Sequence, residues 1–313
     1  MSNSISRRGF IAAAGAASAA QAASALAQAS GTLAPTGDFY VNSQKVFLAE
    51  NTRQEIREAL AGGRLKAAIL PAGSVEQHNE HLALVCDIAM STLVSQQVAL
   101  QLYPQVTVAP PCPLGWAPYH MARKGTLTIR KETLQAYVFD VLKSLRAHGI
   151  RIVLILNGHS GNHEILQQSL PGWRKELGIT LDADSYWRGI EEVEMKKWLT
   201  SRAGVSHAAE FETSLLLAAF PERVRRFTMQ EYDAAAARWN FEGDFPPEVA
   251  EYLKPFTPKG EHGRDRARQE QALLASAEKG QELIAAATRF FVRRMNKMIE
   301  THRAGKPWPP AKT

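Results

Sequence analysis

Four side chains of types that commonly bind metal ions follow two apolar runs of the sequence. The first run leads to Glu76 and His78, and Asp87 stands nine residues after His78. The second run leads to His159. Two carboxylates and two imidazoles form a hard-to-borderline ligand set that suits Zn²⁺ or Mn²⁺. These residues therefore predict metal-assisted hydrolysis.

The spacing of these residues favours a shared site. Glu76 and His78 stand at positions i and i+2, so an extended backbone directs both side chains to the same side. His159 comes three residues after the apolar run 152–156. In open α/β sheets, ligand sites form outside the carboxyl ends of the strands. A single histidine is more often a hydrogen-bonded core or surface residue, but four ligand-type residues at two strand ends indicate a metal site.

A third group of polar residues opens an apolar helix at 207–214. Acidic residues at a helix start stabilise the helix dipole, which accounts for Glu212 and its neighbour Thr213. That interpretation does not explain why His207 and Glu210 lie three residues apart, where one helical turn places them on the same face.

Strands and helices must alternate to position these residues. Thr52 and Glu55 have the spacing of a capping box. Alternation of this kind predicts βαβ units and a mainly parallel sheet covered on both faces. Prolines 246, 247, 255 and 258 indicate an irregular connection before the last helix. We predict strands at 66–72, 106–109, 152–156 and 180–183, and helices at 52–61, 89–102, 131–148, 165–177 and 269–300.

Length and composition indicate a globular α/β protein. The chain has 313 residues, of which 45% are hydrophobic and 22% charged, enough for one large domain or two small ones. Its formal charge of +6 is modest and its basic residues are spread out, which disfavours nucleic-acid binding. Cys86 and Cys112 are the two cysteines, and the sequence leaves open one disulfide or two separate buried thiols.

The N-terminal residues have the pattern of a targeting segment. Arg7 and Arg8 form a twin-arginine pattern, and Ala25-Leu26-Ala27 is an A-x-A cleavage site. The weakly apolar stretch between them is too short for a membrane anchor, so we expect no membrane association after cleavage. We predict a signal peptide at 1–27, export to the periplasm by the twin-arginine route, a flexible lead-in at 28–44, a catalytic domain at 45–300 and a C-terminal tail at 301–313.

At these motifs the sequence resembles the creatininase (creatinine amidohydrolase) family over roughly residues 45 to 295. Several motifs in the right order are far more specific than any single one. The resemblance rests on Leu70–His78 with Asp87, on Asn157–Asn162, on His207–Ser214, and on Gly115–Met121 with Gly125-Thr126.

This resemblance implies a three-layer α/β/α sandwich with a mainly parallel sheet, two divalent metal ions per chain (Zn, Mn or both) and a homo-oligomer, commonly a hexamer. By position, Glu76 and His159 hold one metal, His78 the other, and Asp87 bridges them. Creatininase carries a metal-binding glutamate where this chain has Gly161. Because residue 161 is a glycine here, we expect Glu210, the glutamate of the third motif His207–Ser214, to complete the second metal's ligands.

The same resemblance implies a reaction and a pocket. Two divalent ions bind one hydroxide and polarise an amide carbonyl, and His207 protonates the departing nitrogen. The expected activity is an amidohydrolase acting on the C–N bond of a small cyclic amide or formamide. Candidate substrate-binding residues are Trp187 as a pocket wall, His120, Arg123 and Ser160.

Departures from creatininase itself point away from creatinine as the substrate. Ala203 and Ser206 replace a tryptophan and a glutamate that precede the catalytic histidine in creatininase. Arg123-Lys124 stands where relatives often have Phe-Pro, which suggests a substrate with a carboxylate or phosphate. The alternatives are a lactonase or short-peptide hydrolase using the same site, or an exported binding protein that sequesters a metal or solute without turnover.

Overall fold

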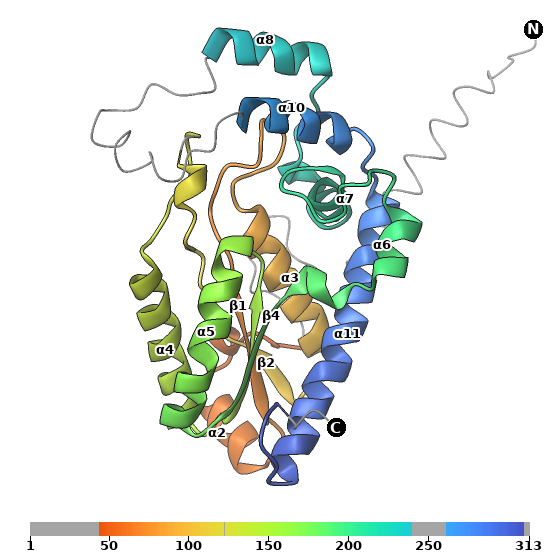
Figure 1. Ribbon diagram of the computed structural model, residues 1–313. Helices are drawn as coiled ribbons and strands as arrows, with labels where there is room; N and C mark the ends of the chain where they lie inside the picture. The colour runs from red at the N-terminus through yellow and green to blue at the C-terminus, as the bar shows by residue number, and fades with distance from the viewer. Residues whose placement is uncertain (1–43, 122, 240–260, 310–313) are drawn as a thin grey trace, which may run out of the picture.

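A computed structural model describes residues 44–121, 123–239 and 261–309 (Figure 1). Its central sheet has the strand order β2-β1-β3-β4, and every neighbouring pair is parallel. Ala72 at the end of β1 lies opposite Asn157 at the end of β3, so the two strands end level with each other. The strands are β1 (Ala67–Ala72), β2 (Val106–Val108), β3 (Ile152–Asn157) and β4 (Thr180–Ser185).

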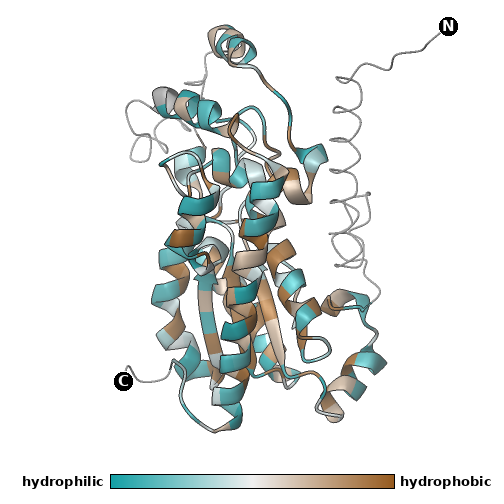
Figure 2. Cartoon of the chain, turned by 90° about the vertical axis from the view of Figure 1, so that its right-hand side faces the viewer, coloured by the Kyte–Doolittle hydropathy of each residue, from teal (hydrophilic) through white to brown (hydrophobic). Residues whose placement is uncertain are grey.

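Helices cover both faces of this sheet, which confirms the predicted three-layer α/β/α sandwich (Figure 1). Side chains alternate between the faces: Leu154 packs toward α3 and α11, whereas Ile155 packs toward α4 and α5. β1 and β3 are buried along their whole length, and hydrophobic residues concentrate in the sheet and on the helix faces against it (Figure 2). The covering helices are α3 (Cys86–Gln101) and α11 (Ala277–Arg303) on one face, and α4 (Lys131–Ala147) and α5 (Ser160–Leu177) on the other.

Three further helices gather at one end of the molecule: α7 (Glu210–Ala219), α8 (Met229–Trp239) and α10 (Glu261–Ala272) (Figure 1). α10 contacts both α7 and α8. The remaining helices are α2 (Arg53–Ala61), α6 (Glu192–Trp198) and four short 3-10 turns, η1 (Leu48–Glu50), η2 (Pro118–His120), η3 (Tyr186–Gly189) and η4 (Pro221–Arg223).

Most predicted elements are observed near their predicted bounds. The capping box of α2 is present: the Thr52 hydroxyl accepts the amide of Glu55 at 3.3 Å, and the Glu55 carboxylate accepts the amide of Thr52 at 2.7 Å. α5 begins at Ser160, five residues before its predicted start. The single helix predicted at 269–300 is wrong. Its first residues belong to α10, which ends at Ala272, and α11 starts afresh after Ser276, whose hydroxyl accepts the amide of Lys279 at 3.3 Å.

Several predictions about the chain ends lie outside the described residues. The signal peptide at 1–27, the lead-in up to residue 43 and the four prolines at 246–258 belong to this group. α11 continues to Arg303, so the predicted boundary at residue 300 falls inside a helix. Cys86 and Cys112 are both buried and free, so the disulfide alternative is not realised. Within the described ranges, no helix is long and apolar enough to cross a membrane.

Candidate metal centre

The candidate metal ligands meet at the carboxyl ends of β1 and β3. The strand order reverses between these two strands, and ligand sites of open α/β sheets form at such a switch point. Glu76 and His78 follow β1, and His159 follows β3 directly before α5. Asp87 lies in the first turn of α3, where the helix dipole favours a carboxylate.

Two glycines allow α3 to approach both strand ends. A Cβ atom on Gly73 would lie 2.6 Å from the Cα of Ile88, and one on Gly158 would lie 2.1 Å from the carbonyl oxygen of Asp87. Both distances are shorter than any side chain tolerates. Glycine at these two positions therefore lets the first turn of α3 bring Asp87 between the strand ends.

Asp87 stands between two imidazoles. Its Oδ1 lies 3.1 Å from Nε2 of His78, and its Oδ2 lies 3.0 Å from Nδ1 of His159. Glu76 adds a carboxylate on the His159 side, with its Oε2 at 3.0 Å from Nδ1 of His159. Glu212 adds a carboxylate on the His78 side, with its Oε2 at 3.5 Å from Nε2 of His78. These contacts define two ligand groups around one carboxylate. In Glu76/Asp87/His159 the donor atoms all lie within 4.8 Å of one another. In His78/Asp87/Glu212, Nε2 of His78 faces both carboxylates, and Cys86 lies within 4.8 Å of His78 and Glu212.

The other nitrogen of each imidazole is held by the backbone. Nδ1 of His78 donates to the carbonyl oxygen of Glu76 at 3.1 Å, which leaves the lone pair on Nε2. Nε2 of His159 donates to the carbonyl oxygen of Trp116 at 3.1 Å, which leaves the lone pair on Nδ1. Metal-binding histidines are oriented in this way in proteins, since the second hydrogen bond fixes the tautomer and the ring. Both lone pairs face Asp87.

The donor atoms fit divalent ions. Oε2 of Glu76 is buried and makes no hydrogen bond of acceptable geometry, although it lies 3.0 Å from Nδ1 of His159. Tetrahedral ligands at about 2.0–2.2 Å from an ion lie about 3.3–3.6 Å from one another. The observed separations of 3.0–3.5 Å in the two groups are close to these values. An ion would satisfy the orphaned oxygen.

The electrostatics of the cluster also favour a bound cation. Burial and the nearby Asp87 carboxylate raise the pKa of Glu212 to about 7. Burial lowers the pKa of His78, but Cys86 and Asp87 outweigh burial and raise it well above its ordinary value. The pKa of His159 is raised for the same reason, because carboxylates surround it. These raised pKa values favour protonation of the metal-free cluster, and a divalent ion would compete with the protons for the same atoms.

The Glu210 carboxylate, predicted to complete the second metal's ligands, lies outside both ligand groups. Its Oε1 accepts hydrogen bonds from the Lys279 ammonium at 2.5 Å and the Thr200 amide at 2.9 Å, and its Oε2 accepts the Ser201 amide at 2.6 Å. The prediction rested on the family resemblance, with support from the i, i+3 spacing of His207 and Glu210. α7 begins only at Glu210, so the i, i+3 rule does not apply to His207. Glu212, two residues further on, contributes the carboxylate instead.

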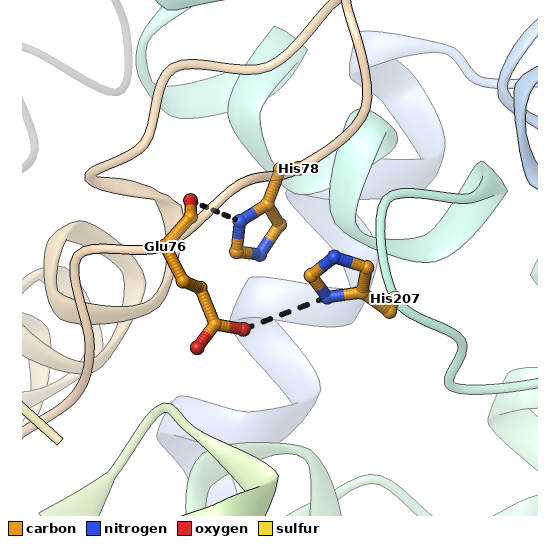
Figure 3. A group of neighbouring side chains, drawn as sticks. All are labelled: Glu76, His78 and His207. Carbon is orange, nitrogen blue, oxygen red and sulfur yellow. Dashed lines mark hydrogen bonds and ion pairs between the residues drawn. The ribbon is translucent and has the colours of Figure 1, made fainter. Parts of the chain in front are cut away.

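His207 and His120 lie beside the ligand groups. Nδ1 of His207 is 3.6 Å from Oε1 of Glu76, and its ring centroid is 4.3 Å from that of His78 (Figure 3). The His120 ring stacks on His207 at 4.3 Å, and its Nε2 is 3.2 Å from Oε1 of Glu76. The structure thus brings both predicted histidines to the site.

Gln77 is a site residue that the sequence prediction missed. Its amide nitrogen lies 2.9 Å from Nδ1 of His120 and 3.0 Å from Nε2 of His207. Because an amide NH₂ only donates, these two nitrogens act as acceptors and both imidazoles are neutral. Burial agrees with this assignment, since it lowers the pKa of His120 to about 4 and that of His207 well below its ordinary value. The sequence feature that could have predicted a role for Gln77 is its position between two predicted metal ligands, Glu76 and His78.

The remaining predicted pocket residues have different surroundings. Ser160 is exposed at the start of α5, close to Tyr119, whose hydroxyl lies 3.2 Å from Nε2 of His159. Trp187 packs edge-on against Tyr186 and lines a separate cavity whose lining contains none of the cluster residues. Arg123 forms an ion pair with Asp265 of α10 at 2.9 Å. The structure brings Ser160 near the cluster but does not bring Trp187 there.

Known proteins resemble this chain in fold and in sequence. A manganese form of creatininase covers 98% of its own length and 81% of this chain with a TM-score of 0.63 at 23% identity. A Zn–Zn form of a mutant creatininase has a TM-score of 0.62 at 24% identity, with the same coverage. Identities this low establish the fold alone.

Three curated relatives carry different activities in their names. The creatinine amidohydrolase of Pseudomonas putida is 27% identical over 58% of this chain and 75% of its own length. The 3-dehydro-scyllo-inosose hydrolase of Thermotoga maritima is 28% identical over 85% of this chain and 87% of its own. A mycofactocin precursor peptide peptidase of Mycobacterium ulcerans is 31% identical over 50% of this chain and 59% of its own.

The family described as "Creatininase: Creatinine amidohydrolase" matches residues 49–295, a range that contains every residue of the two ligand groups. The match spans most of the chain and agrees with the solved structures and the curated relatives. The protein is therefore a member of the creatininase family.

Proposed function

We propose that this protein is a metal-dependent hydrolase that cleaves a C–N bond of a small amide. The observation that carries the proposal is Asp87, whose two carboxylate oxygens face two different imidazoles at 3.1 and 3.0 Å. Glu76, Asp87 and His159 would hold one ion, Zn²⁺ or Mn²⁺, and His78, Asp87 and Glu212 the other. When bound, two divalent ions supply an activated water and polarise the carbonyl of the substrate.

His207 is suited to move the proton that such a hydrolysis requires. It is neutral, since its pKa lies well below its ordinary value, so it can accept a proton and pass it to the departing nitrogen. Gln77 holds the Nε2 side of the ring at 3.0 Å, and the stacked His120 ring restrains its tilt. These contacts orient the ring with its Nδ1 at 3.6 Å from Oε1 of Glu76.

The relatives support hydrolysis without fixing the substrate. Their names are creatinine amidohydrolase, mycofactocin precursor peptide peptidase and 3-dehydro-scyllo-inosose hydrolase, so relatives of this chain act on different substrates. The peptidase relatives favour a short-peptide hydrolase as the second candidate, ahead of a lactonase. A non-catalytic metal- or solute-binding protein has no use for a neutral, oriented imidazole at His207.

A panel of lactams, formamides, lactones and dipeptides tests the proposal on the zinc- or manganese-loaded protein. We expect turnover of at least one amide, a loss of about 10²–10⁴-fold in His207→Ala, and an unchanged metal content in that variant. His148, a histidine remote from the cluster at the end of α4, provides the matched control as His148→Ala. Metal-loaded protein that hydrolyses no member of the panel would contradict the proposal and favour the binding alternative.

We also propose that the protein acts in the periplasm as a homo-oligomer on a small-molecule substrate. The twin-arginine pattern at Arg7 and Arg8 supports export, and the family resemblance supports assembly. Cell fractionation of the wild type and of a variant with both arginines changed to lysine tests export. Sedimentation of the mature protein tests assembly, and a monomer at micromolar concentration would overturn it.

A further inference from the structure

Cys86 is a buried thiol that lies against one of the two ligand groups. It is the first residue of α3, directly before Asp87, and it is 0% exposed. Its Sγ, a ring nitrogen of His78 and a carboxylate oxygen of Glu212 all lie within 4.8 Å of one another. The proposed function leaves this sulfur atom without a role.

Three separate segments bring these atoms together. His78 follows β1, Cys86 opens α3, and Glu212 lies in the first turn of α7. Nδ1 of His78 donates to the carbonyl oxygen of Glu76, so Nε2 carries the lone pair that a metal ion needs. Oε2 of Glu212 lies 3.5 Å from that Nε2. The thiol therefore stands beside two groups that already face each other as ligands do.

The spacing of the three donor atoms fits a tetrahedral zinc ion. A Zn–S bond is about 2.3 Å long and Zn–N and Zn–O bonds are about 2.0–2.2 Å, which separates sulfur from its neighbouring ligand atoms by about 3.5–3.7 Å. Separations of this size lie within the observed limit of 4.8 Å. No disulfide competes for the sulfur, because Cys112, the other cysteine of the chain, is also free.

The thiol would make the two metal positions unequal. Cys86 would give its ligand group a fourth protein ligand, and four ligands close a tetrahedral site. The ligand group that contains Glu76 has three, and a site with three protein ligands keeps a position open for water or substrate. His207 lies on the side of this three-ligand group, with its Nδ1 at 3.6 Å from Oε1 of Glu76.

The charges of the ligands favour a thiolate at this position. Glu76, Asp87 and Glu212 supply three negative charges when ionised, and a thiolate at Cys86 adds a fourth, which matches two divalent ions. All four side chains are buried, where an unbalanced charge is costly. The sulfur also lies at the N-terminus of α3, where the helix dipole stabilises an anion.

We propose that Cys86 is a thiolate ligand of the ion held by His78, Asp87 and Glu212, and that it makes this site selective for zinc over manganese. The thiol proton leaves to solvent as the metal–sulfur bond forms. Thiolate is a soft ligand that suits Zn²⁺, whereas Mn²⁺ prefers carboxylate, carbonyl and water ligands. This inference deepens the proposed function and rests on its metal centre, but it depends on no substrate.

Loading of the metal-free protein with Co²⁺, a spectroscopic substitute for Zn²⁺, tests the inference. A cobalt–thiolate bond gives a charge-transfer absorption band in the near ultraviolet, and carboxylate and imidazole ligands give none there. The variants are Cys86→Ala and Cys86→Ser, of which the second keeps the size of the side chain in case the first does not fold. Cys112→Ala is the matched control, because Cys112 is equally buried and free but packs among apolar residues on the opposite face of the sheet.

We expect the band in the wild type and in Cys112→Ala, and its loss in both Cys86 variants. Chelator competition should show that the ratio of zinc to manganese affinity at this site falls about tenfold or more in the Cys86 variants and stays unchanged in Cys112→Ala.

Bound cobalt without the band in the wild type would overturn the inference and leave the proposed function intact, and so would a band that persists in the Cys86 variants. A wild type that binds no divalent ion would contradict both the inference and the proposed function. Elemental analysis of each sample distinguishes these outcomes.

Discussion

At the scale of single residues, the site depends on which atoms face which. Asp87 can serve both ligand groups because its two oxygens point to opposite imidazoles. Glu210 and Glu212 differ by two positions, yet one lies against Lys279 and backbone amides and the other against His78. A side chain of the right type is a ligand only where the backbone aims it at the ion.

Exchange of each of these two glutamates for glutamine separates their roles. Glu212→Gln removes a charged ligand at constant size, so we expect the metal content to fall from about two to about one ion per chain. Glu210→Gln should retain both ions but lower the stability by about 3 kcal/mol, because Lys279 loses its buried partner. Elemental analysis and thermal unfolding measure the two effects. Loss of an ion in Glu210→Gln together with full occupancy in Glu212→Gln would restore the original prediction.

At the scale of elements, the site is assembled where three backbone segments approach closely. The strand ends of β1 and β3 and the first turn of α3 meet at Gly73 and Gly158. The start of α5 makes a similar approach at Gly161, where a Cβ atom would lie 2.4 Å from the Tyr119 hydroxyl and 2.5 Å from the carbonyl oxygen of Trp116. The place of the glutamate found in creatininase is therefore filled by groups that contact His159.

Alanine at two glycines of α5 tests this packing. Gly161→Ala must displace the Trp116 carbonyl, which accepts the hydrogen bond that orients His159. Loss of such an orienting contact weakens metal binding by about 10–100-fold, and we expect an effect of that size. Gly172→Ala lies in the same helix with no atom within 4 Å of the added Cβ, and should stabilise the protein by about 0.5–1 kcal/mol. Metal titration that gives equal affinities for both variants would contradict the expectation.

At the scale of the whole molecule, the cluster links metal content to stability. Folding without metal brings three carboxylates and two imidazoles into a buried space, where raised pKa values favour bound protons at Glu212, His78 and His159. The pKa of Glu212 rises from 4.5 to about 7 on folding, and those of His78 and His159 rise as well. Above the unfolded histidine pKa of 6.5, these three groups bind more protons in the folded protein than in the unfolded chain, so stability falls as pH rises. Below pH 6.5 the lowered pKa values of His81, His120 and His207 act in the opposite direction.

We therefore expect the metal-free protein to lose stability between about pH 6.5 and about pH 8, and the zinc-loaded protein to show the opposite trend, because protons compete with the metal. Thermal unfolding across this range, with and without chelator, measures both trends. Glu212→Gln should reduce the slope of the metal-free protein, since one raised pKa is removed. A metal-free protein that is more stable at pH 8 than at pH 6.5 would contradict the raised pKa values of the cluster.

The sequence by itself determined the layered fold and the core of the site. Hydrophobic runs and helical spacing are local signals, and they predicted the parallel strands, most helices and the convergence of Glu76, His78, Asp87 and His159 at two strand ends. The spacing of His207 and Glu210 supports a shared face only in a regular helix, and that helix begins at Glu210. The prediction therefore named Glu210, whereas Glu212 lies against His78.

Only the tertiary structure decided what lies across the site. Gln77 between two histidines, Tyr119 and the Trp116 carbonyl on His159, and Arg123 with Asp265 of α10 join segments far apart in the chain. No periodicity or short motif encodes such contacts, because they depend on how closely whole elements pack. The sequence specifies the types of the ligand residues, whereas the fold determines their orientation, hydrogen-bond partners and charge balance.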